Sequence, residues 1–165
     1  MKTLKRRRKE NKTDYARRIN LLKGESPRVV FRKTNRYIIA QYVTSKAAQD
    51  KIELSVTSKS LLEHGWPKDF EGSLKSIPAS YLTGFLLGKR ISMEEMDTPI
   101  LDTGMIKNLH KSKVFGFLKG LKDAGVEVKC DEEFFPDDET IMGKHLKKDF
   151  SKAFEGIKSS IEKKK

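Results

Sequence analysis

The chain has 165 residues, which is enough for one domain with its own core. It carries 35 Lys/Arg and 23 Asp/Glu, a net charge of +12, and its hydrophobic share of 36% is below that of most globular proteins. The single cysteine, Cys130, excludes an internal disulfide and a thiolate metal site and favours a reducing compartment. No apolar run approaches the ~20 residues that span a bilayer, and no apolar segment follows the basic start as in a secretory signal.

The positive charge is concentrated at the two ends of the chain. Residues 1–36 hold 14 Lys/Arg and 3 Asp/Glu, a net of +11, and residues 144–165 hold 8 and 3, a net of +5. The middle, residues 37–143, has a net of −4, from 13 and 17. This distribution predicts that the ends bind a polyanion. Nucleic acid is favoured over an acidic membrane surface, because residues 1–12 offer only Leu4 as an apolar membrane contact.

We therefore expect three parts: a basic N-terminal arm at 1–12, a single domain at 13–143 and a basic amphipathic helical extension at 144–165. The arm is too charged to fold alone, since like charges repel and no apolar group offsets the ordering entropy.

Residues 13–24 are predicted to form a short helix, with Thr13 as its N-cap and Gly24 as its stop. Its apolar side chains recur at helical spacing and are expected to dock on the body: Tyr15, Ile19, Leu21 and Leu22. Arg17 and Arg18 then point towards solvent or a ligand. A solvated basic helix face is an equally ordinary interpretation.

Two runs rich in β-branched and aromatic residues, 28–33 and 37–43, predict a hairpin with its turn around Asn35. Alternation places Val29 and Phe31 on one face of the first strand. The basic residues gather on the other face and around the turn: Arg28, Arg32, Lys33 and Arg36.

After the hairpin, a polar loop is expected at 45–51 and a half-buried third strand at 52–57. A short helical turn then ends at Gly65, and a loop leads to a helix that begins at Pro78. In that helix, Gly84 and the glycine four residues later are expected to allow tight packing on the sheet.

A short strand is predicted at 99–104, a helix at 112–124 and another short strand at 126–128. The sheet is then mixed, because a helical crossover adds a parallel strand to an antiparallel hairpin. The fold class is therefore α/β, with a small mixed β-sheet and helices. From Ile141 to Ile161 the apolar residues keep a helical period, as one bent helix or as two.

Motifs for catalysis are missing. There is no Walker A loop, no Gly-x-Gly-x-x-Gly after a strand and no Gly-x-Ser-x-Gly, and the three histidines are far apart. Asp102, at a strand end, is the one candidate catalytic acid, although an Asp before Thr103-Gly104 is more commonly a turn former. We expect no enzyme activity, no cofactor and no metal.

Short blocks of residues follow one another along the chain. The first are Asp14-Tyr15-x-x-Arg18-x-x-Leu21-Leu22-Lys23, Pro27-Arg28-Val29-Val30-x-Arg32-Lys33-x-Asn35 and Ile38-x-Ala40-Gln41. The later ones are Gly65-Trp66, Pro78-Ala79-x-Tyr81-Leu82-Thr83-Gly84-x-Leu86-x-Gly88, Leu101-Asp102-x-Gly104, Leu118-Lys119-Gly120-x-x-Asp123-Ala124-Gly125 and Gly143-x-His145. In this order, the blocks resemble the archaeal and eukaryotic-type large-subunit ribosomal protein eighteen, a 5S rRNA-binding family.

The resemblance implies a fold of ribonuclease-H-like topology without the nuclease carboxylates. It implies a structural protein of the cytoplasmic ribosome that binds 5S rRNA and helps join it to the large rRNA in the central protuberance. Neighbouring large-subunit proteins are further implied partners, with no membrane and no small-molecule substrate. Two other functions stay open: a magnesium-dependent nuclease on a related fold, and a generic polyanion-binding protein.

The resemblance also implies that the arm and the open face of the sheet carry the RNA contacts. At matching positions these residues are Lys5, Arg6, Arg7, Arg8, Lys9, Lys12, Tyr15, Arg18, Arg28, Arg32, Asn35 and Arg36. Tyr15 or Tyr37 can stack on an unpaired base, but Tyr15 lies on the apolar helical stripe, which favours a place in the core.

Overall fold

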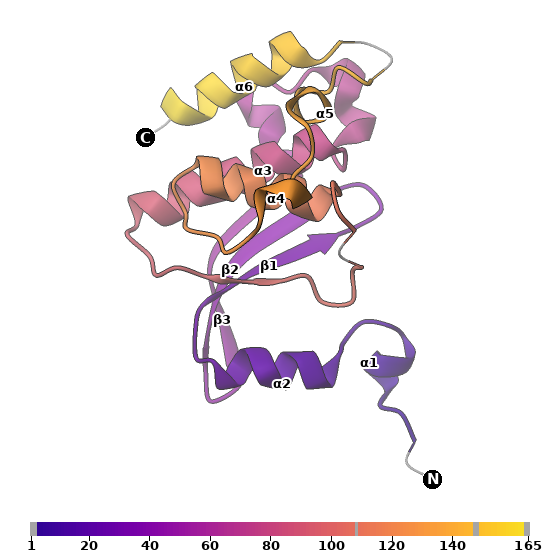
Figure 1. Cartoon of the computed structure of the whole chain (residues 1–165), viewed down its shortest axis with the longest axis vertical. Helices are drawn as coiled ribbons and strands as arrows, with labels where there is room; N and C mark the ends of the chain where they lie inside the picture. Colours follow the sequence, from indigo (N-terminus) through magenta and orange to yellow (C-terminus); the bar gives the residue numbers. More distant parts are fainter. Residues whose placement is uncertain (1–2, 108, 147–148, 164–165) are drawn as a thin grey trace.

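The computed structural model describes residues 3–107, 109–146 and 149–163, and is built around one β-sheet (Figure 1). Its helices and strands are α1 (Arg6–Lys9), α2 (Tyr15–Lys23), β1 (Arg28–Lys33), β2 (Ile38–Lys46), β3 (Gln49–Thr57), the 3-10 helices η1 (Ser58–His64) and η2 (Lys68–Ser73), α3 (Ile77–Met93), β4 (Ile100–Asp102), α4 (Lys113–Asp123), the 3-10 helix η3 (Glu132–Phe134), α5 (Asp138–Met142) and α6 (Ser151–Lys163). None of the helices in these ranges is both long and apolar enough to cross a membrane.

The sheet has four strands in the order β3-β2-β1-β4. β1 pairs antiparallel with β2, and β2 with β3, whereas β4 lies parallel to β1 after the crossover through α3. The predicted α/β class and mixed sheet are thus confirmed. In the β1–β2 turn, the Thr34 hydroxyl donates to the Tyr37 carbonyl at 2.8 Å and accepts the Tyr37 N–H at 2.9 Å.

The core lies between the sheet and α3 and α4, which cover one face, while α2 lies on the other side (Figure 1). Val29 and Phe31 are each 1% exposed, so the predicted alternation of β1 is confirmed. Phe31 reaches Phe117 of α4, with 5.1 Å between ring centroids. The outward face of the sheet is therefore the one that carries Arg28 and Arg32.

The glycines of α3 serve helix–helix packing, not the expected packing on the sheet. A Cβ on Gly84 would lie 2.2 Å from the Phe117 carbonyl oxygen, and one on Gly88 would lie 2.6 Å from the Ala124 Cβ. Gly120 of α4 makes the corresponding close approach to α3, because a Cβ added there would lie 2.2 Å from the Tyr81 carbonyl oxygen. The two helices cross at a distance that only these glycines permit.

The predictions for residues 45–51 and 126–128 are wrong. The expected loop at 45–51 is instead the end of β2, a two-residue turn and the start of β3. The turn residues Ala47 and Ala48 have φ of 50° and 63°, the left-handed conformation of a tight hairpin turn, without the usual Asn or Gly. Residues 126–128 form no strand: the Val126 N–H donates to the Leu121 carbonyl at 3.1 Å and closes the end of α4.

At the C-terminal end the helical pattern is divided between α5 and α6. Phe150, Phe154 and Ile157 are buried in the same hydrophobic cluster as the sheet residues. Phe150 packs on Trp66, with 4.6 Å between ring centroids. The last helix is thereby anchored over α3 and η1, on the side of the molecule away from α2 (Figure 1).

Candidate nucleic-acid interface

The basic N-terminal segment lies against the outward face of the sheet. α2 begins one residue later than expected, because the Asp14 carboxylate, and not Thr13, accepts the N–H groups of Ala16 and Arg17, at 3.1 and 3.4 Å. No residue of α2 is fully buried, and Ile19 is 52% exposed. The expected docking through an apolar stripe is thus only partial, and polar contacts do much of the anchoring.

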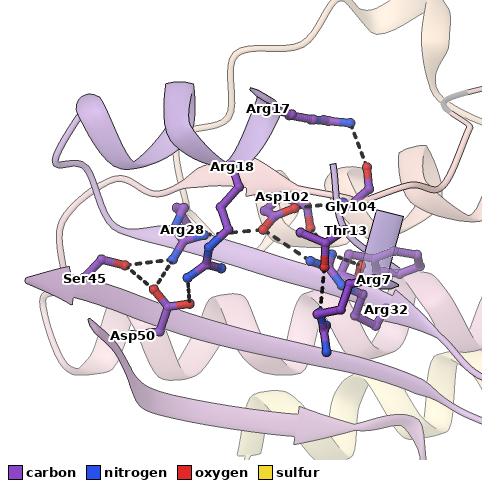
Figure 2. A network of polar contacts seen from close by, with 11 residues as sticks. Arg7, Thr13, Arg17, Arg18, Arg28, Arg32, Ser45, Asp50, Asp102 and Gly104 are labelled. Carbon is purple, nitrogen blue, oxygen red and sulfur yellow. Dashed lines mark hydrogen bonds and ion pairs between the residues drawn. The ribbon is translucent and has the colours of Figure 1, made fainter. Parts of the chain in front are cut away.

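The centre of these contacts is the side chain of Arg28, which is 1% exposed (Figure 2). One guanidinium nitrogen donates to the Ser45 hydroxyl and to the Asp50 carboxylate, both at 2.7 Å. The other donates to the Asp102 carboxylate at 3.5 Å. The sequence resemblance implies that Arg28 contacts RNA, but the structure gives its guanidinium internal partners from β2, β3 and β4.

Asp50 connects this buried arginine to α2. Its second carboxylate oxygen accepts a hydrogen bond from Arg18 at 2.9 Å (Figure 2). Partial burial acts to raise the pKa of Asp50, but hydrogen bonds from Ser45 and Arg18 and the charges of Arg28 and Arg18 outweigh it, so the pKa lies below its usual value. The carboxylate is therefore held ionised between two strands and the helix.

Asp102 organises the other side of the network. Its carboxylate accepts from Arg32 at 3.2 Å and from the Gly104 N–H at 2.8 Å, and its carbonyl accepts a second Arg32 nitrogen at 2.8 Å. Asp102 is thus the turn former that its sequence setting favoured. Within the described parts of the chain, no three His, Cys, Asp or Glu side chains are grouped to hold a metal ion.

The arm, α2 and the sheet enclose a cleft of about 120 Å³. That volume is several times the ~10–15 Å³ that one water molecule needs and accommodates an anionic group. Five basic side chains line it: Arg7, Lys12, Arg17, Arg18 and Arg32. Asp14 and Asp102 are the acidic members, so positive charge is in excess. The basic residues of the cleft thus come from α1, α2, β1 and the segment between α1 and α2, with Arg7 first and Arg32 last in the sequence.

Arg17 also lines this cleft, although it is not among the RNA contacts that the family resemblance implies. Its guanidinium donates to the Gly104 carbonyl at 3.1 Å and so ties α2 to the turn after β4 (Figure 2). The signal for Arg17 in the sequence was only its place beside Arg18 in a short helix.

The arm is not wholly extended. Residues 6–9 form the single turn α1, none of whose residues is buried. Arg8 pairs with Asp14 at 3.0 Å, and Arg7 donates to Thr13 at 2.9 Å. The Arg17 N–H bond to the Asp14 carboxylate, aided by Arg8, lowers the pKa of Asp14. These contacts fold the arm back over the cleft.

Tyr15 lies outside the hydrophobic core, so the favoured core position is wrong. Its ring is half-buried and is covered by the Lys5 ammonium, 4.5 Å from the ring centroid. Displacing Lys5 would expose the ring face to a base.

The turn of the β1–β2 hairpin presents free basic groups. Lys33 and Arg36 are exposed and make no ion pair with any part of the chain that the structure describes. Asn35 is also exposed, and its carbonyl accepts a hydrogen bond from Lys75 at 2.7 Å.

Arg6 and Lys12 of the arm both contact Glu10, at 3.8 and 2.8 Å, as exposed pairs that contribute little to stability.

Comparison with known proteins gives one consistent family. A family model described as "Ribosomal large subunit proteins 60S L5, and 50S L18" matches residues 1–98. The large ribosomal subunit protein uL18 of Korarchaeum cryptofilum is 43% identical over 141 residues, which is 86% of this chain and 70% of that protein. The uL18 of Methanothrix thermoacetophila is 40% identical over 142 residues, 86% of this chain and 82% of that protein.

The matched region contains α1, α2 and the first three strands, and with them every basic side chain of the cleft. The similarity to the uL18 proteins extends over most of the remaining chain. This chain belongs to the family of large-subunit ribosomal proteins that comprises 60S L5 and 50S L18.

Proposed function

We propose that this chain is a structural component of the large subunit of cytoplasmic ribosomes that binds 5S rRNA and helps attach it to the large rRNA in the central protuberance. The observation that carries this proposal is the cleft where five basic side chains from the arm, α2 and β1 converge. Each arginine guanidinium can donate two parallel hydrogen bonds to the oxygens of one phosphate, and each lysine adds a positive point charge.

In this proposal the exposed basic residues contact RNA directly. They are the arm residues Lys5, Arg6, Arg7, Arg8, Lys9 and Lys12, with Arg18, Arg32 and Arg36 on the body. The neutral side chain of Asn35, in the turn beside Arg36, contacts RNA with them. Arg28 has a different role, because its guanidinium is buried and occupied. It positions Asp50 and Asp102, which in turn orient Arg18 and Arg32 towards the cleft.

The partly folded arm supports binding that depends on RNA shape. α1 has no buried residue and its ion pairs are exposed, so the arm can open at small cost and close on RNA. The A-form major groove is closed to side chains, so selectivity for 5S rRNA has to come from its loops and from its overall form. Tyr15, once Lys5 moves, offers a ring for an unpaired base.

The test is binding to 5S rRNA with tRNA as competitor over a salt series. The arm variant carries Arg6→Gln, Arg7→Gln and Lys9→Gln. The control variant carries Lys46→Gln, Lys59→Gln and Lys129→Gln, three exposed lysines outside the cleft. Removing three phosphate contacts lowers the slope of log K against log salt by about 2 to 3.

We expect the arm variant to show this reduced slope and the control variant to match the wild type. Wild-type binding should resist competition by tRNA and by anionic vesicles. Equal affinity for 5S rRNA, tRNA and vesicles would overturn the proposal in favour of a generic polyanion-binding protein.

A further inference from the structure

A second basic surface lies at the end of the sheet where the β1–β2 turn meets the N-terminal ends of α3 and α4. We call Lys33, Lys75, Lys113 and Arg36 the lysine cluster. Lys75, just before α3, donates to the Asn35 carbonyl at 2.7 Å and so joins the turn to that helix. The Ser80 hydroxyl of α3 donates to the Lys113 carbonyl at 2.6 Å and so fixes the start of α4 beside it.

The charges of this cluster act on one another. The pKa of Lys113 lies below its usual value, first because its ammonium is partly desolvated and then because Lys33 and Lys75 repel it. No carboxylate is among the groups that shift the pKa of Lys113, because the charges that act on it are those of Lys33 and Lys75. The repulsion is thus left uncompensated among the described residues.

The helix ends add to the positive potential. Lys113 is the first residue of α4, where a cation is unfavourable because the exposed N–H groups carry partial positive charge. The first turns of α3 and α4 contain no acidic residue. Ser112 occupies the N-cap of α4 without bonding to it, and its hydroxyl oxygen is buried with no partner in the described structure. An anion would offset each of these costs.

We propose that the lysine cluster binds phosphate groups of an RNA backbone, as a second surface apart from the cleft between the arm and α2. Lys33, Lys75 and Lys113 come from three elements that the Asn35 and Ser80 contacts hold together. None of the exposed large hydrophobic residues lies at 33–37, 75–77 or 112–114, so the surface lacks the apolar anchors of a protein interface. The inference rests on the proposed function, because it takes ribosomal RNA as the partner.

The first test uses the wild-type chain and needs no mutation. The lysines are acetylated at neutral pH with a limiting amount of an amine-reactive acetylating reagent. The reaction is run on the free protein and on its complexes with 5S rRNA and with large-subunit rRNA, and the modified sites are quantified by mass spectrometry. We expect Lys33, Lys75 and Lys113 to lose reactivity severalfold with at least one RNA, while Lys46 and Lys129 do not. Unchanged reactivity at the three positions with both RNAs would overturn the inference.

The second test compares the cluster variant, Lys33→Gln, Lys75→Gln and Lys113→Gln, with the control variant defined above. A loss of three phosphate contacts should reduce the magnitude of the salt slope by about 2 to 3. If the affinities are equal at 1 M salt, this corresponds to a fall in affinity on the order of 40- to 300-fold at about 0.15 M salt. Unfolding midpoints establish that the variant is folded. The relief of mutual repulsion opposes the loss of the exposed Lys75 bond to the Asn35 carbonyl, so we expect little change in stability.

The outcomes separate this inference from the proposed function. If the wild type binds neither RNA selectively, the proposed function fails. If the wild type and control bind and the cluster variant binds both RNAs with the wild-type slope, only the lysine cluster is refuted. Polyglutamate binding that the cluster variant loses, with RNA binding unchanged, would assign the surface to an acidic protein segment and overturn the RNA assignment.

Discussion

The guanidinium of Arg28 donates to the Asp50 carboxylate at 2.7 Å, across the intervening strand β2. Arg28 is 1% exposed, whereas the Asp50 side chain is 31% exposed and also accepts from Arg18 of α2. One carboxylate therefore holds a buried arginine of the sheet and an exposed arginine of the helix. Through this shared carboxylate, the sheet fixes the position of Arg18 on the basic surface.

The two arginines of this arrangement should differ in their effect on stability. Arg28→Met leaves Asp102 and Asp50 short of a partner, and we expect the free energy of unfolding to fall by about 2–4 kcal/mol. Arg18→Met removes an exposed partner of the same carboxylate and should cost less than about 1 kcal/mol. Urea denaturation of both variants measures the difference, and equal losses would contradict the assignment of Arg28 as the structural member.

Asp50 should make the stability depend on acid. Its pKa in the folded chain is lowered, so the unfolded state binds the proton more tightly. The contribution of Asp50 is then fully present above the unfolded value of about 3.9 and is lost as the pH falls through the lower, folded value. Asp50→Asn should therefore reduce stability at neutral pH and show a smaller further loss below about pH 4. Parallel acid limbs for variant and wild type would contradict this.

The sheet could be predicted from the sequence because its signals are local. Val29 and Phe31 alternate with arginines, and this pattern alone places the buried face. The turn at Ala47-Ala48 could not be predicted, since neither residue favours a left-handed conformation and the pairing of β2 with β3 imposes it. The strand expected at 126–128 failed because the end of α4 uses the Val126 N–H.

The candidate site was predicted from charge and from the family resemblance, and neither shows which arginines are engaged inside the protein. Charge identifies the arginines of the N-terminal third but does not say which of them are free. Arg28 and Arg32 occupy equivalent positions in the alternating pattern, yet Arg28 is enclosed by Ser45, Asp50 and Asp102. Those partners lie 17, 22 and 74 residues away, so no local pattern could separate the two arginines.

The crossing of α3 and α4 should not tolerate side chains at its glycines. A Cβ on Gly120 would lie 2.2 Å from the Tyr81 carbonyl oxygen and 2.9 Å from the Phe85 nitrogen, both backbone atoms. Gly120→Ala must push the helices apart, and we expect a loss of about 3 kcal/mol or more. Gly156→Ala in α6 is the matched control, because a Cβ there meets nothing within 4 Å. It should stabilise by up to about 1 kcal/mol in thermal or urea unfolding.

Gly104 is the position where backbone conformation and the basic cleft meet. Its φ is +61°, and a Cβ there would lie 3.0 Å from the central carbon of the Arg32 guanidinium. Gly104→Ala should reduce stability by about 1–2 kcal/mol through the left-handed conformation and should displace Arg32 from Asp102. We therefore also expect weaker binding to 5S rRNA. The salt slope should change by less than about one, because no charge is removed.

The matched control for this position is Gly72→Ala, since a Cβ on Gly72 meets nothing within 4 Å and its φ is not positive. Urea unfolding and RNA titration on the two variants separate a general effect of alanine from the effect on Arg32. If Gly104→Ala loses stability but binds 5S rRNA as tightly as the Gly72 variant, the position of Arg32 does not matter for binding. The hydrogen bonds of Arg32 to Asp102 would then be structural, and the RNA contacts of the cleft would be made by the arm and α2.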